Sequence, residues 1–267
     1  MKTRRGQVAA IQAGSTPESG ERIAKVLARA GLCSRREAER WIAESRVAVD
    51  GTVLTSPAFN VRPGNAVAVD GQPLRAAEKP RLWRYHKPSG LIVTSRDPEG
   101  RPTIFSKLPD TMPRVVSVGR LDLDSEGLLL LTNDGSLARH LELPATGWVR
   151  RYRVRVFGTP DAARLAALEK GSSADGIDYG PITAEIERQK GRNAWLSLSL
   201  REGKNREIRR VLEPLGLTVN RLIRVSYGPF QLGSLARGEV EEVTGKVLRE
   251  QLGAALKRDK SHADHRR

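Results

Sequence analysis

Apolar positions in residues 21–72 predict two short helices followed by a small sheet. The first helix ends at Gly31, and its apolar residues recur at helical spacing: Ile23, Val26, Leu27 and Ala30. Ser34 and Glu37 have the spacing of a capping box, which predicts that a second helix begins there, with Ala38, Trp41 and Ile42 facing inward. Two apolar segments then end in the hairpin-turn signal Asp-Gly, at Asp50-Gly51 and Asp70-Gly71.

From Leu82 to about Leu248 the pattern is dominated by strands. Residues 152–156 and 196–200 alternate between apolar and polar side chains, as half-buried antiparallel strands do. Helical spacing returns after Gly203, where Ile208, Val211, Leu212 and Leu215 define one apolar face. Strands and helices do not alternate regularly, so the fold class predicted is α+β with a mixed, mainly antiparallel sheet.

Between these elements, the segment 118–135 combines acidic residues with apolar runs. Three carboxylates, Asp122, Asp124 and Glu126, lie within five positions between Gly119 and Gly127. The flanking runs 115–118 and 128–131 are predicted to be short buried strands. A carboxylate in a low-dielectric cleft needs a cationic partner to stay charged, and Asp122 lies nearest Arg120. Asp124 and Glu126 are expected to be ordinary loop residues.

Composition adds a preferred partner to this picture. The chain has 267 residues, 39% of them hydrophobic, and a formal net charge of +15. Such a charge attracts polyanions and disfavours self-association, so we expect a monomer that binds nucleic acid. The single cysteine, Cys33, excludes an internal disulfide and a cysteine zinc site. No apolar run could span a bilayer and no signal-peptide core is visible, so a cytoplasmic location without membrane contact is expected.

Two further segments carry candidate chemistry. Alternation in 151–156 places Tyr152 on the face opposite the neighbouring arginines, either as a core tyrosine or as a platform on which a base stacks. In the predicted helix after Gly203, spacing puts Arg206 and Arg210 on one surface and Arg209 at the edge of the apolar face. A guanidinium there needs an acidic partner, for which Asp122 is a candidate, unless the helix is simply exposed and basic.

The predicted organisation has four parts. Residues 1–20 are a flexible lead, 21–75 the first domain, 82–248 the second, and 249–267 a basic tail, with a linker around 78–81.

The first domain resembles the S4 RNA-binding domain. The matching segments are 22–31, 34–39 and 46–51. The resemblance implies that a group of basic residues contacts RNA phosphates, although each alone could be a solvated charge. The group is Lys25, Arg29, Arg35, Arg36, Arg40 and Arg46.

The second domain resembles the RsuA/RluB family of ribosomal RNA pseudouridine synthases. Together with the S4 unit, the resemblance covers residues 21 to 248. The motifs that carry it are Gly119–Asp122 with the following segment 123–135, Tyr85–Gly90, Arg151–Val156, Gly203–Arg210 and Arg221–Pro229. Related sequences often have an acid or a lysine where this chain has Arg151. The helix 205–210 and the segment 221–224 are more similar to the large-subunit, RluB-like branch than to members that act on small-subunit RNA.

The resemblance implies a site without metal or other cofactor. Asp122 would be the catalytic aspartate, Tyr152 would pack against the target base, and Arg209 would pair with the aspartate; Arg120 would be a neighbour that binds substrate. Isomerising uridine requires breaking the bond from ribose to the base nitrogen, turning the base and rejoining it through carbon. A carboxylate could attack the sugar or base, or remove a sugar proton. The uridine must leave any helix to be reached.

Two other functions fit parts of the sequence. The S4 unit and the basic surface could serve a non-catalytic RNA-binding or ribosome assembly factor, although the set Asp122, Tyr152 and Arg209 argues against it. Hydrolysis of a glycan by paired acids is disfavoured because only 4% of the residues are aromatic and none is placed to stack on a sugar.

Overall fold

The computed structural model describes residues 20–251, which divide into two compact units at Ala77/Glu78. The predicted lead and tail lie almost entirely outside the described residues. Of the tail, only 249–251 are described, and they continue a helix that begins at Gly245. None of the helices within 20–251 is long and apolar enough to cross a membrane.

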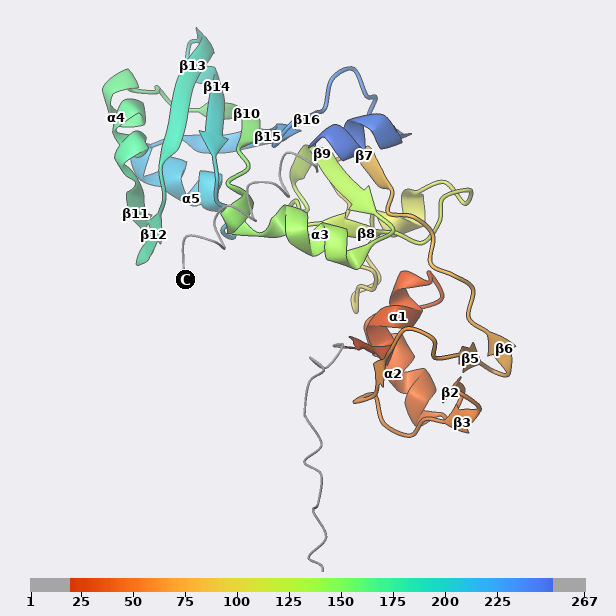
Figure 1. Cartoon of the computed structure of the whole chain (residues 1–267). Helices are drawn as coiled ribbons and strands as arrows, with labels where there is room; N and C mark the ends of the chain where they lie inside the picture. The colour runs from red at the N-terminus through yellow and green to blue at the C-terminus, as the bar shows by residue number, and fades with distance from the viewer. Residues whose placement is uncertain (1–19, 252–267) are drawn as a thin grey trace, which may run out of the picture. The chain divides into compact units, whose positions relative to one another are not determined.

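The first unit consists of two helices and a small sheet (Figure 1). Its elements are β1 (Glu21–Arg22), α1 (Ile23–Arg29), α2 (Arg35–Ala43), β2 (Val47–Val49), β3 (Thr52–Val53), β4 (Asn60–Val61), β5 (Val67–Val69) and β6 (Gln72–Pro73). The main sheet has the order β3-β2-β5-β6, and β1 pairs with β4.

Local sequence signals account for this unit. Ser34 caps α2 in a full capping box with Glu37, as predicted. Both Asp-Gly pairs form hairpin turns in which all four residues have positive φ, the conformation such turns require. Ile23, Leu27 and Ile42 are fully buried and hold the helices on the sheet.

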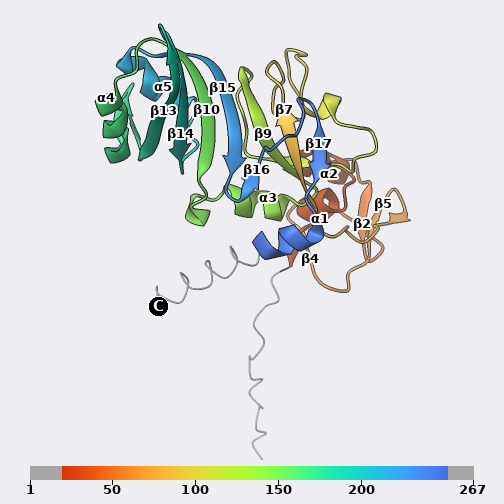
Figure 2. The ribbon, with the colours of Figure 1, turned by 90° about the horizontal axis from the view of Figure 1, so that it is seen from above.

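The second unit is built on a nine-stranded sheet. Its main path, β13-β14-β10-β15-β9-β7-β17, runs across Figure 2, while β16 pairs with β15 and β8 with β9. The strands are β7 (Leu82–Lys87), β8 (Val116–Val118), β9 (Ser125–Thr132), β10 (Arg150–Phe157), β13 (Ile182–Lys190), β14 (Asn193–Leu200), β15 (Thr218–Tyr227), β16 (Phe230–Gln231) and β17 (Val240–Glu242). A separate hairpin comprises β11 (Ser172–Ala174) and β12 (Ile177–Tyr179). The helices of this unit are α3 (Gly135–Glu142), α4 (Ala162–Ala167) and α5 (Glu207–Leu212), besides the helix that begins at Gly245. The predicted α+β class is confirmed.

Strand β9 is buried on both faces. Leu129 and Leu131 belong to one hydrophobic cluster, with Tyr152, Val154 and the apolar side of α5, whereas Leu128 and Leu130 belong to another, with α3. The predicted buried strand over 128–131 is therefore confirmed. For 115–118 the prediction is wrong at Val116, which is 40% exposed because β8 lies at the side of the sheet.

The pairing of β9 with β15 is the one parallel pair among the described strands of the nine-stranded sheet. It involves three residue pairs, Leu222↔Ser125, Ile223↔Glu126 and Arg224↔Gly127. Gly127 has φ of +105°, and a Cβ atom there would lie 2.3 Å from the carbonyl oxygen of Arg224. Only glycine combines this conformation with so close an approach.

We expect Gly127→Ala to lower the free energy of unfolding by about 3 kcal/mol, since it adds backbone strain to a steric clash. Urea denaturation of both proteins measures the difference. Gly135→Ala is the matched control, because a Cβ atom at Gly135 meets nothing within 4 Å. Equal stability of the Gly127 and Gly135 variants would contradict the role assigned to the close approach.

Candidate active site

A pocket of about 510 Å³ opens beside the junction of β9 and β15. Tyr152 is its aromatic residue, and Leu121, Leu200, Ile208 and Leu222 contribute apolar surface. Its wall is rich in charge. Its cations are Arg96, Arg120, Arg150, Lys204, Arg206 and Arg224, and its acids are Asp97, Asp122 and Glu207. Such a wall suits a polyanionic substrate that presents one flat, uncharged base.

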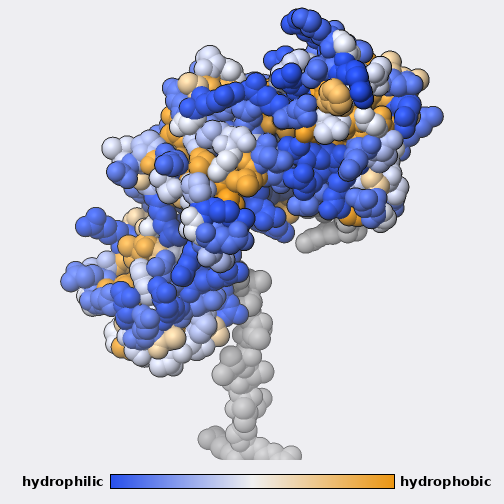
Figure 3. All heavy atoms as spheres, turned by 180° about the vertical axis from the view of Figure 1, so that it is seen from behind, coloured by the Kyte–Doolittle hydropathy of each residue, from blue (hydrophilic) through white to orange (hydrophobic). Residues whose placement is uncertain are grey.

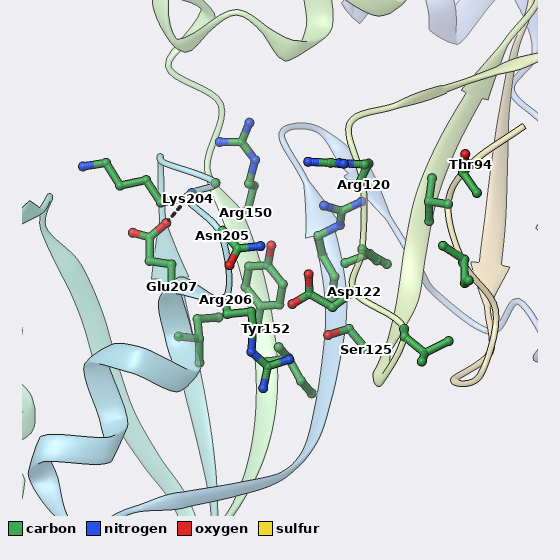
Figure 4. A pocket seen from close by; sticks show the side chains of 18 of the residues that line it. Thr94, Arg120, Asp122, Ser125, Arg150, Tyr152, Lys204, Asn205, Arg206 and Glu207 are labelled. Atoms are coloured by element: carbon green, nitrogen blue, oxygen red, sulfur yellow. Dashed lines mark hydrogen bonds between the residues drawn. The ribbon is translucent and has the colours of Figure 1, made fainter. Parts of the chain in front are cut away.

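Asp122 lies in the loop that joins β8 to β9. Its side chain faces the same hollow as the ring of Tyr152 (Figure 4). The carbonyl oxygen of Asp122 accepts hydrogen bonds from the amide of Ser125, at 3.1 Å, and from the ammonium group of Lys87, at 3.0 Å. The backbone of the loop is thus held while the carboxylate remains in the pocket.

The side chain of Lys87 holds this loop in place through hydrogen bonds. It is fully buried, and its Nζ also donates to the carbonyl oxygens of Pro88, at 3.1 Å, and Ser125, at 2.8 Å. Burial lowers the pKa of Lys87 to about 8, although the carboxylate of Asp122 acts in the opposite direction. Lys87 lies in the motif Tyr85–Gly90, but nothing in the sequence around it indicated a role for this lysine. Its position ties the end of β7 to the aspartate loop.

Tyr152 comes from β10, whose alternation is confirmed by its buried residues. Tyr152, Val154 and Val156 are buried, and the arginines between them are exposed. Tyr152 retains 8% of its surface and lines the pocket, so it belongs to the core and to the pocket at once. Both interpretations of the tyrosine are compatible with this place. Arg120, on the approach to Asp122, is exposed and also lines the pocket.

Arg209 does not pair with Asp122, and that prediction is wrong. Its Nη2 lies 2.9 Å from Oδ2 of Asp124, and its Nη1 donates to the carbonyl oxygen of Val219 at 2.8 Å. Arg209 is absent from the pocket wall. The predicted acidic partner exists, but it is the next acid along the loop, because the turn at 123–124 directs Asp124 towards α5.

Two further predictions about this region need correction. Glu126 is part of β9, and its buried carboxylate forms ion pairs with Arg221 and Arg237. These partners hold the pKa of Glu126 below its usual value against the effect of burial. Arg206 does not share a helical surface with Arg210, because it precedes α5 with φ of +50°. That conformation directs Arg206 to the pocket wall.

Two buried charged groups at the pocket were not identified from the sequence. Arg224 is 3% exposed, and its Nε donates to the carbonyl oxygen of Leu128 at 2.7 Å. Glu207 accepts a hydrogen bond from the amide of Lys204 at 2.9 Å, and burial raises its pKa. Both residues occur in motifs quoted above. Sequence alone does not show which charged residues of an arginine-rich segment are buried, so Arg224 and Glu207 could not be singled out.

In the first unit, the predicted RNA-binding residues differ in their partners. Lys25 and Arg29 both pair with Glu21, at 2.8 and 2.6 Å. Two other members of the group pair with different acids: Arg40 contacts Glu37 and Glu44, and Arg46 contacts Glu44 and Asp70. Arg35 and Arg36 are exposed and form no ion pair within residues 20–251. They are the members of the group most accessible to phosphate.

Comparison with known proteins identifies the family. The sequence model for RNA pseudouridylate synthase matches residues 81–214, half of the chain, and the S4 domain model matches residues 21–67. The chain belongs to the RNA pseudouridylate synthase family. The resemblance inferred from the motifs is therefore confirmed, and the chain is an RNA pseudouridine synthase with an S4 domain.

Relatives of this family extend the match over most of the chain. An uncharacterised RNA pseudouridine synthase of Rickettsia prowazekii is 48% identical over 86% of this chain and 97% of its own length. A ribosomal large subunit pseudouridine synthase B of Pasteurella multocida is 45% identical over 84% of this chain and 67% of its own length. A crystal structure of a pseudouridylate synthase, 26% identical, superimposes with a TM-score of 0.59 over 85% of this chain and 97% of the other.

Proposed function

We propose that the protein isomerises a uridine of large-subunit (23S) ribosomal RNA to pseudouridine, with Asp122 as the catalytic residue. The observation that carries the proposal is the shared pocket, in which the carboxylate of Asp122 and the ring of Tyr152 lie among six cationic side chains, with Asp97 and Glu207 as the other acids. The identity of 45% to a large-subunit enzyme supports this choice of RNA.

The chemistry requires few groups. Isomerisation conserves atoms and oxidation state: the bond from C1′ to N1 breaks, one from C1′ to C5 forms, C5 loses a proton and N1 gains one. The carboxylate of Asp122 acts on the nucleoside as a nucleophile or as a base, without a cofactor. Tyr152 packs on the flipped base and limits its movement while it is detached. Arg120 binds the substrate backbone, whereas Arg209 positions the loop through Asp124.

The proposed substrate also indicates how the protein binds RNA and where in the cell it works. The S4 unit contacts RNA phosphates, and the enzyme works as a monomer in the cytoplasm. Figure 3 shows a face of the molecule on which hydrophilic residues predominate and apolar residues form scattered areas, as expected for a surface that meets RNA rather than lipid.

The test is to incubate unmodified large- and small-subunit ribosomal RNA with the protein and to map pseudouridines in both. We expect new pseudouridine in the large-subunit RNA. Modification confined to the small-subunit RNA would overturn the choice of substrate. Binding without any pseudouridine would instead support the non-catalytic RNA-binding factor.

We expect removal of two charges from the first unit, in Arg35→Gln/Arg36→Gln, to weaken RNA binding at low salt by about tenfold. Each lost phosphate contact should also reduce the salt dependence of the affinity. Lys25→Gln/Arg29→Gln is the matched control and should have a smaller effect, since both cations are paired with Glu21, which offsets one of their two charges. A larger loss in the control would contradict the assignment. Titration at several salt concentrations measures both quantities.

A further inference from the structure

Within the described residues of the second unit, one half of the large sheet is covered on one face only. In β13, β14, β10 and β15, inward side chains such as Val154, Leu196 and Leu198 pack with α4 and α5 in one cluster. The second cluster, on the opposite face, includes Ile223 and Tyr227 of β15 and no described residue of β10, β13 or β14. We call this uncovered face, with its side chains on β13, β14, β10 and β15, the outer face. Tyr152 points the other way.

The outer face is strongly basic. Its acids within the described strands are Glu185 and Glu187, and Glu187 is paired with Arg153 at 2.9 Å. The cations that alternation and ring contacts place on this face are Arg151, Arg153, Arg155, Arg188, Lys190, Arg192 and Arg221. Among them, Arg155, Arg188 and Lys190 form no ion pair within residues 20–251. They are cations without an internal counterion.

These three cations share a hollow with an aromatic ring. A concavity of about 260 Å³ is lined by Arg155, Arg188, Lys190 and Trp195, together with Asn193 and Ala194. Strand register explains the grouping, because Trp195 lies opposite Arg188 on one side and opposite Arg155 on the other. A row of alternating charge and aromatic surface thus crosses three strands.

Arginine and aromatic side chains are also stacked here. The guanidinium of Arg153 lies 4.9 Å from the centre of the Trp195 ring, and that of Arg221 lies 5.9 Å away. Two positions along β10 from Arg155, Phe157 is 40% exposed and is covered by Arg192 at 4.5 Å. Nucleic-acid bases stack on aromatic rings and on guanidinium planes alike. The outer face therefore offers two neighbouring stacking positions beside unpaired cations.

We propose that the outer face is a second RNA-binding surface, which holds a single-stranded segment of the RNA with its phosphates on Arg155, Arg188 and Lys190 and bases on Trp195 and Phe157. Open sheets that carry aromatic and basic side chains bind single-stranded RNA in this way. The occupant is RNA rather than a protein segment because the unpaired cations of this face outnumber Glu185, its one unpaired acid among the described residues, and aromatic surface alternates with these cations. The proposal extends the proposed function, since the same RNA would occupy this face and the pocket, but binding here does not require catalysis.

The experiment measures binding of the full chain to a short single-stranded RNA that contains no uridine. The variant Arg188→Gln/Lys190→Gln should bind about tenfold more weakly at low salt, and the slope of log affinity against log salt should fall by about 1.4, or 0.7 for each phosphate contact. The control, Lys107→Gln/Lys246→Gln, removes two exposed charges from other elements and should change affinity less than twofold. Equal changes in the two variants would overturn the proposal.

A second variant tests stacking separately. Trp195→Leu should weaken binding of the single strand at least about fivefold and leave binding of the corresponding duplex unchanged. Unchanged binding of the single strand, or an equal loss for the duplex, would overturn the stacking part of the proposal. Because the RNA lacks uridine, these outcomes are independent of whether the protein forms pseudouridine, so failure of the proposed function would be seen only in the mapping experiment.

Discussion

Replacing Asp122 by asparagine is expected to reduce pseudouridine formation by at least about 10³-fold, the scale on which enzymes lose activity when a group that reacts with substrate is removed. The substitution preserves the shape of the side chain and removes its charge. The carbonyl oxygen that accepts from Lys87 and Ser125 is unchanged, so the loop should keep its conformation. RNA affinity and the urea midpoint should therefore equal those of the wild type, which binding and denaturation measurements would check.

The matched control is Asp110→Asn, the same chemical change at an exposed position away from the pocket. It should leave the rate of pseudouridine formation unchanged. Asp124→Asn should have an intermediate effect, since it weakens the ion pair that holds Arg209. A rate for the Asp122 variant close to that of the wild type would refute the catalytic assignment.

Lys87→Met should lower the rate of pseudouridine formation by about 30-fold. Three carbonyl oxygens would lose a charged donor, and one charge-assisted hydrogen bond alone is worth about 2 kcal/mol. Methionine occupies a similar volume, so the apolar surroundings should remain filled. If Asp122 is displaced as expected, kcat falls more than KM rises. A pure change in KM would show that Lys87 acts on RNA binding and not on the position of Asp122.

The pH dependence of Lys87 provides a sharper test, because activity and stability should change in opposite directions. The folded pKa of Lys87 is about 8, below its ordinary 10.5, so the unfolded chain binds more protons between these values. The contribution of Lys87 to stability therefore rises with pH across this window. Activity should instead fall above about pH 8, as a neutral amine has fewer protons to donate to the loop. The fall assigned to Lys87 should be absent in Lys87→Met.

The sequence predicted the local elements well and the long-range pairing less well. Tyr152 could be placed on the inner face of a strand, and Ser34 at the start of a helix, because both depend on local periodicity or capping. The partner of Arg209 depends on which acid of a short loop turns towards α5, and spacing alone did not distinguish Asp122 from Asp124. Lys87 and Arg224 were not identified because the carbonyl oxygens of Asp122, Ser125 and Leu128, to which they donate, lie far from them in the sequence.

The parallel pairing of β9 with β15 also has a consequence for how the pocket is assembled. It brings together residues far apart in the chain through a short ladder. By contrast, β14 pairs with β10 and β13 through long antiparallel ladders. Closing a long loop reduces the conformational entropy of the chain before the contacts between its ends can compensate for that loss. The ladder at this junction has three residue pairs, supported by the ion pair of Glu126 with Arg221 and the hydrogen bond from Arg224 to Leu128, and the aspartate loop directly precedes it. Secondary structure on either side can form during folding before Asp122 and Tyr152 lie in one pocket, so the ability to modify RNA should be the last property that the chain acquires.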